Sequence, residues 1–244
     1  PCDLPLVPVP PRPERTGEFT VVRPLVRSPA DRRVSSPTVR PVRLAVLVPV
    51  KRFTAAKGRL TGVLGDADRA RLAEWMATRV VDVVAEIPTF VACDDDRVAA
   101  WAESRGARVL WSAGLGLNGA VDDAVSRVTS LGFDHLTVSH ADLPLPDALV
   151  HVAHAGTISL VPDRRSDGTN VMSFPLTSPI RAGYGGGSFR RHLAQAMSRA
   201  DTPVEVRFDP ELSLDLDTVR DLTHPLIREV LPTWLRTNPV NPST

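Results

Sequence analysis

Two short acidic segments carry side chains suited to binding a divalent cation. Asp142 lies in HADLPL (140–145), directly after an apolar run, and DLDT (215–218) supplies Asp215 and Asp217. Hard cations such as Mg²⁺ take carboxylate and phosphate oxygens. Residues two apart in an extended backbone share a face, so either Asp217 or Asp215 could be the second carboxylate. We predict an Mg²⁺ site here, and the alternative is that these carboxylates only cap the turns that follow.

The two lysines of the chain lie in one segment, VPVKRFTAAKGRL (48–60). The sequence has 27 Arg and only Lys51 and Lys57, and Arg59 follows within the same loop. Lysine is a compact, flexible point charge, whereas arginine is a rigid fork, so the two are not interchangeable at a phosphate. The three cations suit a nucleotide triphosphate, with a solvated charged loop as the alternative. The segment matches neither the P-loop nor the Rossmann fingerprint.

Two more segments, SDGTN (166–170) and GYGGGSF (183–189), could hold an anion. Four of the 15 glycines fall within 183–187, just before a helix predicted from Ser188. Glycines allow backbone N–H groups to face an anion, and a helix N-terminus favours negative charge. A flexible surface loop is the alternative. The chain has no G-x-S-x-G segment, so hydrolysis by a Ser-His-Asp triad is not expected.

Alternating strands and helices must position these segments. The apolar run 43–50 predicts a strand that is covered on both faces. A helix is predicted over 67–86 with Asp66 as its N-cap, and another is expected to be capped by Asn118. Further strands are predicted at 89–93, 107–110, 135–140, 157–162, 169–174 and 204–208, and further helical regions at 96–104, 146–153, 188–200 and 215–222.

This alternation predicts an α/β fold, a single three-layer domain with a mostly parallel mixed sheet and right-handed crossovers. In such sheets, ligands bind beyond the carboxyl ends of the strands. The loop after the first strand and the HADLPL segment both fall at that edge. We therefore expect the cations and the carboxylates to belong to one site.

Length and charge limit the possible functions. A chain of 244 residues and 26.4 kDa fits one such domain with a tail. Residues 1–43 carry eight Arg and four acids, whereas the rest carries 21 basic and 24 acidic residues, which argues against a nucleic-acid surface. Ten of the 23 prolines lie within 1–41. We predict a disordered Pro/Arg-rich tail at 1–42, a folded α/β domain at 43–236 and an unstructured end at 237–244.

Cysteine content and hydropathy exclude other protein classes. Cys2 and Cys93 form no C-x-x-C pair, so a zinc finger and a disulfide scaffold are not expected. The chain has no run of 18 apolar residues and no signal-peptide pattern. We therefore expect a cytoplasmic protein without a membrane span.

Six segments in this order resemble one family of enzymes: VPVKRFTAAKGRL, GLNGAV, HADLPL, DGTN, YGGGSFRRH and DLDT. Together they are similar to the 2-phospho-L-lactate / phosphoenolpyruvate guanylyltransferases, which make the activated intermediate for the deazaflavin coenzyme F-420. The resemblance spans about residues 43–225. It implies a glycosyltransferase-A-like nucleotidyltransferase fold. It also implies Mg²⁺-dependent transfer of GMP from GTP onto a phosphate monoester, with release of pyrophosphate.

The resemblance also implies roles for single residues. Asp142 and Asp217 would hold Mg²⁺ and, with Lys51, form the catalytic set. Lys51 would also contact the acceptor, together with Thr169, Gly185 and Ser188. The residues expected to bind GTP are Lys57 and Arg59 at the triphosphate and Leu117 and Asn118 at the guanosine.

The expected acceptor is phosphoenolpyruvate, which would give enolpyruvyl-diphospho-guanosine. The same reaction on 2-phospho-L-lactate or 3-phosphoglycerate is an alternative. So are a sugar-phosphate or molybdenum-cofactor nucleotidyltransferase and an inactive nucleotide-binding module. The partners implied are GTP, a small phosphorylated carboxylic acid and a downstream phospholactate transferase that takes the product, with no nucleic acid and no membrane.

Overall fold

The computed structural model describes residues 40–236. The tails predicted at 1–42 and 237–244 lie outside this range, apart from residues 40–42, which are exposed and have no regular secondary structure. Within 40–236, no helix is long and apolar enough to span a bilayer.

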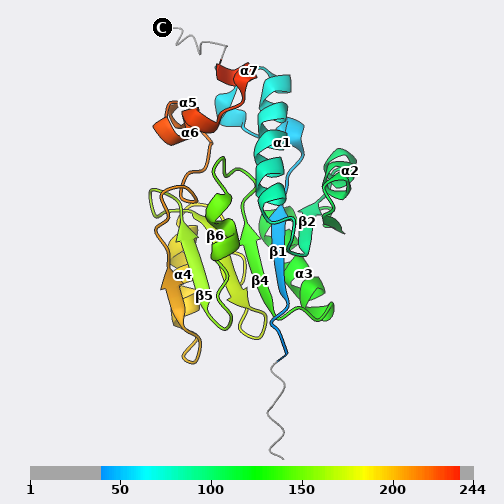
Figure 1. Cartoon of the computed structure of the whole chain (residues 1–244), viewed down its shortest axis with the longest axis vertical. Coiled ribbons are helices and arrows are strands. Elements are labelled where there is room, and N and C mark those ends of the chain that lie inside the picture. Colours follow the sequence, from blue (N-terminus) through cyan, green and yellow to red (C-terminus); the bar gives the residue numbers. More distant parts are fainter. Residues whose placement is uncertain (1–39, 237–244) are drawn as a thin grey trace, which may run out of the picture. The chain divides into compact units, whose positions relative to one another are not determined.

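A seven-stranded sheet forms the centre of the fold, in the order β3-β2-β1-β4-β6-β5-β7 (Figure 1). Its strands are β1 (Leu44–Pro49), β2 (Thr89–Cys93), β3 (Arg108–Trp111), β4 (His135–Ser139), β5 (Ile158–Pro162), β6 (Thr169–Pro175) and β7 (Val204–Val206). Only β6 runs antiparallel to its neighbours, β4 and β5. The other four pairings are parallel, which confirms the predicted mostly parallel mixed sheet.

Helical segments cover both faces of the sheet (Figure 1). One face packs against α1 (Asp66–Val83), α2 (Asp96–Ser104) and the short 3₁₀ helix η3 (Asp147–His151), and the other against α3 (Gly116–Ser130) and α4 (Ser188–Met197). The residues of β1 alternate between these layers, with Val46 and Val48 in the first core and Ala45 and Leu47 in the second. This explains the continuous apolar run and confirms a three-layer domain.

A third apolar cluster fastens the C-terminal part of the fold to α1. Helices α5 (Val219–Leu222), α6 (Pro225–Val230) and α7 (Thr233–Arg236) contribute Leu222, Ile227 and Leu235 to it. Leu214 and Leu216 are buried in the same cluster, next to Leu72 and Met76 of α1. The DLDT segment is therefore anchored by Leu216 and by the preceding Leu214, which alternate with Asp215 and Asp217.

Several predicted boundaries were wrong. Helix α1 begins at Asp66 with Gly65 as N-cap, because the Asp66 carboxylate pairs with Arg69 instead of capping the helix, and α1 ends at Val83. Asn118 does not cap α3, which begins two residues earlier, because its carboxamide bonds to the backbone of Tyr184. The region predicted over 146–153 is the shorter η3, the helix from Ser188 ends at Met197, and helix α5 begins only at Val219.

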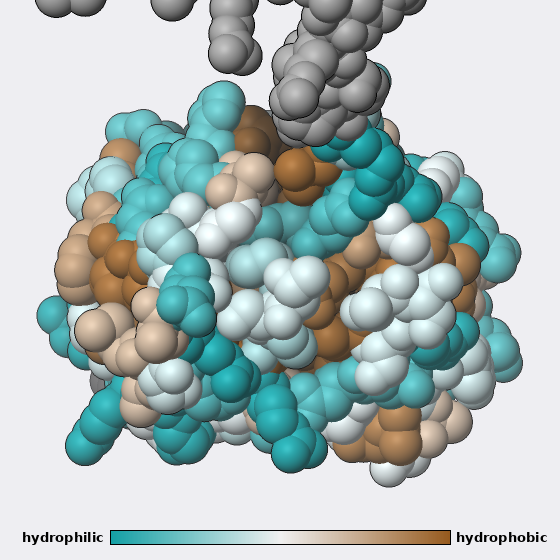
Figure 2. All heavy atoms as spheres, turned by 90° about the horizontal axis from the view of Figure 1, so that it is seen from below, coloured by the Kyte–Doolittle hydropathy of each residue, from teal (hydrophilic) through white to brown (hydrophobic). Residues whose placement is uncertain are grey.

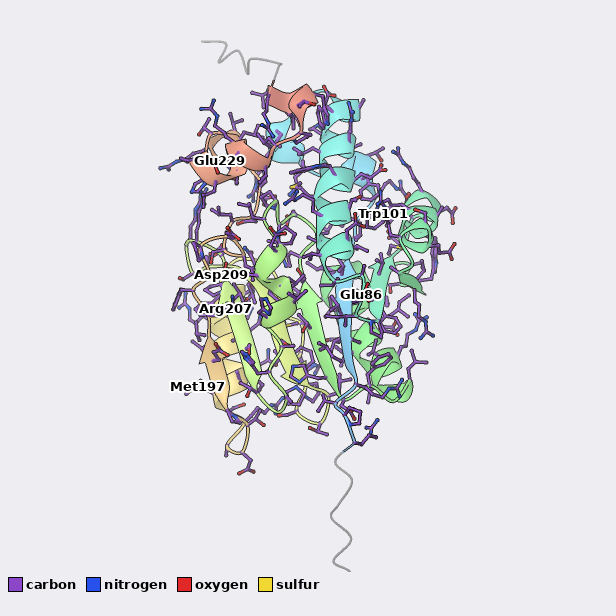
Figure 3. The ribbon with its side chains drawn as sticks, viewed as in Figure 1. Glu86, Trp101, Met197, Arg207, Asp209 and Glu229 are labelled. Carbon is purple, nitrogen blue, oxygen red and sulfur yellow. The ribbon has the colours of Figure 1, made fainter. Side chains whose placement is uncertain are left out.

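Polar residues cover much of the face seen in Figure 2. The face in Figure 2 shows brown hydrophobic patches separated by teal and white residues. Among the larger apolar side chains, Met197 at the end of α4 is 68% exposed (Figure 3). Arg207 and Asp209, which follow β7, lie near each other in the same view and form an ion pair of 2.9 Å.

Candidate active site

The loop after β1 presents a lysine in a strained backbone conformation. This loop contains two short 3₁₀ turns, η1 (Phe53–Ala55) and η2 (Gly58–Leu60), held by the buried side chains of Phe53 and Leu60. Lys57 lies between the turns with φ +58° and ψ +36°, a left-handed conformation. That conformation costs a residue with a Cβ about 1–2 kcal/mol. Such residues persist where the surroundings hold them, often at functional sites.

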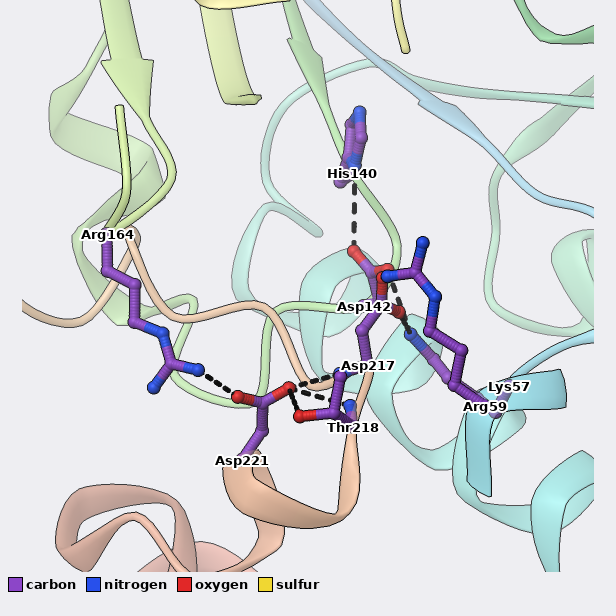
Figure 4. A network of polar contacts seen from close by, with 8 residues as sticks. All are labelled: Lys57, Arg59, His140, Asp142, Arg164, Asp217, Thr218 and Asp221. Carbon is purple, nitrogen blue, oxygen red and sulfur yellow. Dashed lines mark hydrogen bonds and ion pairs between the residues drawn. The ribbon is translucent and has the colours of Figure 1, made fainter. Parts of the chain in front are cut away.

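Lys57 joins the two predicted metal-binding carboxylates. Its Nζ donates to Asp142 Oδ2 at 2.9 Å and to Asp217 Oδ1 at 2.8 Å (Figure 4). The side chain of Lys57 is 6% exposed, whereas that of Arg59 is 75% exposed. Arg59 Nη1 lies 3.6 Å from Asp217 Oδ2. The structure thus brings four predicted site residues together and makes Lys57 the buried centre of a clamp, defined as Lys57, Asp142 and Asp217.

Backbone contacts bring the two carboxylates to the same place. Asp142 lies three residues beyond the end of β4. The Leu216 N–H donates to the Asp142 carbonyl oxygen at 3.2 Å. With Leu216 buried, the flanking residues Asp215 and Asp217 are both partly exposed. The extended arrangement expected for DLDT is therefore present, and it sets Asp217 beside Asp142.

Asp221 supports the clamp and was missed by the sequence analysis. Its Oδ2 accepts from the N–H groups of Asp217 at 3.0 Å and Thr218 at 2.7 Å, and Arg164 pairs with its other oxygen (Figure 4). Burial alone would raise the pKa of Asp221, but these hydrogen bonds hold it below its ordinary value. The T-x-x-D spacing of Thr218 and Asp221 at the start of α5 is a capping box, so this signal was available in the sequence.

The ion pair of the clamp keeps Lys57 and Asp142 charged. Burial favours a neutral Asp142, but the Lys57 ammonium outweighs it and holds the pKa of Asp142 well below its usual range. For Lys57, burial lowers the pKa and the two carboxylates raise it, with a net increase. The third carboxyl, Asp215, behaves differently, because burial and the nearby charge of Asp142 raise its pKa to about 6.

The carboxylates suit a metal that is only partly held by protein. Within residues 40–236, no group of three or more His, Cys, Asp or Glu side chains is arranged to hold a metal ion. Asp142 Oδ1 is buried and has no hydrogen-bond partner among these residues, since His140 Nδ1 is 3.7 Å away. Mg²⁺ is typically bound by one or two carboxylates, with phosphate oxygens and waters as the remaining ligands. The donor set of Asp142 and Asp217 fits that pattern.

Two adjoining cavities lie at the carboxyl ends of the central strands. The first, of about 270 Å³, is lined by the clamp, Lys51, Leu117 and His140, and we call it the carboxylate cavity. The second, of about 340 Å³, extends to the ends of β2 and β3, and we call it the strand-end cavity. Lys51 and Leu117 line both, so the two cavities meet at these residues. Asn118 lines neither cavity.

The residues expected around the acceptor form a second group. The Thr169 N–H donates to Ser188 Oγ at 3.1 Å, and the Ser188 N–H donates to the Gly185 carbonyl oxygen at 3.0 Å. Thr169 and Ser188 are 1% and 2% exposed. Neither they nor Gly185 line the two cavities, so the structure does not join this group to the carboxylate cavity.

His192 connects this group and was also missed. Its Nε2 accepts from the Gly183 N–H at 2.9 Å, and its Nδ1 lies 2.9 Å from Thr169 Oγ1. Because Nε2 accepts, the neutral ring carries its proton on Nδ1 and donates it to Thr169. Burial lowers the pKa of His192 to about 4, which keeps the ring neutral. The histidines had no informative spacing, so only the fold shows this role.

An aromatic contact links the two groups. The Tyr184 ring lies between His192, at 5.1 Å, and His140, at 4.9 Å between centroids. The Tyr184 N–H donates to Asn118 Oδ1 at 2.7 Å, so α3 holds the Gly-rich loop. The N–H groups of Gly185 and Gly186 donate no hydrogen bond to any residue in the described range. They could therefore donate to an anion, and the anion site expected from the glycine content stays a prediction.

Comparison with known proteins agrees with this arrangement. Residues 44–229 match the family described as "Guanylyl transferase CofC like". A phosphoenolpyruvate guanylyltransferase of Sphaerobacter thermophilus is 36% identical over 194 residues, covering 72% of this chain and 89% of that protein. A 2-phospho-L-lactate guanylyltransferase of Methanothermobacter thermautotrophicus is 29% identical, covering 74% and 83%.

A solved structure shows the same fold. The crystal structure of a nucleotide-diphospho-sugar transferase from Desulfovibrio desulfuricans G20 aligns with a TM-score of 0.64 and 21% identity, covering 82% of this chain and 93% of that one. This likeness confirms the predicted nucleotidyltransferase fold. The match over 44–229 and the identity to the Sphaerobacter protein establish the family. The chain belongs to the CofC-like guanylyltransferases, and is a nucleotidyltransferase.

Proposed function

We propose that this protein transfers GMP from GTP onto phosphoenolpyruvate and releases pyrophosphate. The observation that carries the proposal is the Lys57–Asp142–Asp217 clamp, which lines a cavity continuous with a second cavity at the strand ends. Two joined cavities suit a nucleotide whose phosphates and base occupy different places. Relatives named phosphoenolpyruvate guanylyltransferase support the choice of acceptor.

The reaction needs no proton to be removed from the acceptor. An oxygen of the acceptor phosphate is already anionic and forms a bond to the α-phosphorus of GTP. The bond from that phosphorus to the β-phosphate bridging oxygen breaks, and pyrophosphate leaves with the electron pair. Catalysis then consists of positioning the reactants and stabilising charge.

The residues of the clamp would hold Mg²⁺ through Asp142 and Asp217. When bound, the metal would neutralise phosphate charge during transfer. Lys57 Nζ bonds to one oxygen of each carboxylate, and beside a bound metal its ammonium would be available to the triphosphate. Arg59, which is largely exposed, adds positive charge beside Asp217.

Lys51 is the residue best placed to serve both substrates. It lines both cavities and makes no ion pair within residues 40–236. We propose that its ammonium binds the acceptor phosphate or carboxylate. The N–H groups of Gly185 and Gly186, with Thr169 and Ser188 after movement of the loop, would complete the acceptor subsite.

The product would pass to a downstream phospholactate transferase. A phosphoanhydride between GMP and phosphoenolpyruvate is an activated group, so a second transferase must consume it. We further propose that this takes place in the cytoplasm during coenzyme F-420 formation.

Pyrophosphate release tests the proposed function. Purified protein with GTP and Mg²⁺ should release pyrophosphate with phosphoenolpyruvate, and the kcat/KM for 2-phospho-L-lactate and 3-phosphoglycerate should be lower. Release with glucose 1-phosphate and with none of the three-carbon acids would favour a sugar nucleotidyltransferase. GTP binding without turnover on any acceptor would favour a nucleotide-binding module.

A further inference from the structure

The strand-end cavity contains a carboxylate with no partner. Asp94 directly follows β2, is exposed and lines this cavity. It makes no hydrogen bond or ion pair with the part of the chain from 40 to 236. Its neighbour Asp95 is fully engaged, because Oδ1 accepts from the Val98 N–H at 3.1 Å and Oδ2 lies 2.9 Å from Arg52 Nε. These bonds fix the turn that carries Asp94.

Asp94 is the one carboxylate among the side chains of residues 40–236 that line the cavity. The Ser112 hydroxyl donates to the Leu110 carbonyl oxygen at 3.0 Å. Burial raises the pKa of the Cys93 thiol, so it stays uncharged. Lys51 lies where the cavity meets the carboxylate cavity, and Arg52 is paired with Asp95. A ligand in the strand-end cavity would therefore meet one carboxylate that is ready to accept hydrogen bonds.

The first residues of α3 line the same cavity on another side. Gly116 and Leu117 begin this helix and line the cavity, and the first N–H groups of a helix have no partner within it. Donors and a carboxylate acceptor are thus offered to one ligand. The apolar residues Val50, Ala92 and Ala120 form other parts of the lining. The volume of about 340 Å³ falls within the range of small-molecule sites.

The guanine base has hydrogen-bond donors and an acceptor that complement the groups lining this cavity. Its N1–H and its 2-amino group are adjacent donors, which a carboxylate accepts with its two oxygens, and its O6 is an acceptor for N–H groups. Adenine presents a lone pair at N1 and would face the carboxylate with repulsion. We propose that Asp94 binds the N1–H and 2-amino groups of guanine and selects GTP as donor. This inference rests on the proposed use of GTP.

Equilibrium binding of base-modified nucleotides tests the role of Asp94. Calorimetric titration with Mg²⁺ should show that the unaltered protein binds GTP about 10- to 100-fold more tightly than ITP, which lacks the 2-amino group. Asp94→Ala should bring GTP and ITP to within about threefold by weakening GTP. Asp94→Asn should favour XTP over GTP, because an amide N–H can donate to the 2-oxo group of xanthine.

A neighbouring aspartate gives the matched control. Asp96 lies in the first turn of α2, is exposed and does not line the cavity, so Asp96→Asn should keep the GTP, ITP and XTP affinities of the unaltered protein. Unchanged GTP/ITP and GTP/XTP ratios in both Asp94 variants, each with a normal melting temperature, would overturn the proposal. So would an Asp94→Ala variant that loses only the difference between GTP and 2′-deoxy-GTP, since Asp94 would then hold the ribose.

Measuring turnover as well as binding distinguishes a failure of this inference from a failure of the proposed function. If the altered nucleotide affinities appear but phosphoenolpyruvate is not used, the acceptor assignment fails and guanine recognition by Asp94 stands. If phosphoenolpyruvate is guanylylated and the Asp94 variants keep the ordinary GTP/ITP ratio, the function stands and the role of Asp94 is refuted.

Discussion

Replacement of Lys57 by methionine should destabilise the fold measurably. Lys57→Met keeps an unbranched side chain that is one atom shorter, but it removes the charge that pairs with Asp142 and Asp217. Breaking a fully buried pair costs about 3–5 kcal/mol, because a charge is left uncompensated. The two carboxylates are 25% and 38% exposed, so water offsets part of this and about 2–3 kcal/mol is expected. For a domain of this size, the melting temperature should fall by about 5–10 °C.

Thermal unfolding with and without Mg²⁺ checks this expectation. Magnesium should raise the melting temperature of Lys57→Met more than that of the unaltered protein, because no ammonium competes for the carboxylates. Lys51→Met is the matched control, since Lys51 is exposed and unpaired within residues 40–236, and its melting temperature should stay within about 1–2 °C. Equal melting temperatures for the two variants would refute the clamp as a stabilising element.

Three further predictions concern rate and acid stability. Asp142→Asn should lower kcat by about 10³-fold or more with the fold intact, and near-normal turnover at saturating Mg²⁺ would remove Asp142 from the site. Lys51→Arg should lower kcat/KM more than Arg59→Lys does, because Lys51 lines both cavities and Arg59 is largely exposed. Steady-state kinetics that show the reverse order would contradict the assignment of Lys51 to the acceptor. Burial lowers the pKa of His135 and of His192 to about 4, below the value near 6.5 in the unfolded chain. The free energy of unfolding should therefore fall as the pH is lowered from about 6.5 towards 4, by about 3 kcal/mol for each ring. A urea midpoint that does not change between pH 7 and 5 would contradict this last expectation.

The pattern of apolar residues in the sequence was sufficient to predict the three layers of the fold. The apolar run of β1 indicated a strand covered on both faces, and its residues do divide between the two cores. The order of the strands could not be predicted in this way, because it depends on long-range pairing. The antiparallel insertion of β6 between β4 and β5 is one such feature.

Some of the site residues could also be predicted from the sequence. Residue type and position pointed to Lys57 and Asp142 but left Asp215 and Asp217 as alternatives, and the family resemblance favoured Asp217. The structure brings Lys57, Asp142 and Asp217 together. Sequence could not show that Lys57 binds the carboxylates themselves, because this depends on the left-handed turn between η1 and η2. It also could not show that His192 joins Thr169 to Gly183, since that contact spans three separate segments.

The central claim is that the clamp and the Gly-rich loop serve one guanylyl transfer. Phosphorus NMR recorded during turnover tests it most directly, because it observes the bond that forms. With GTP, Mg²⁺ and phosphoenolpyruvate, the account predicts a pair of coupled diphosphate signals from the new phosphoanhydride, growing in step with free pyrophosphate. Unchanged GTP signals, or growth of GDP and inorganic phosphate alone, would contradict it.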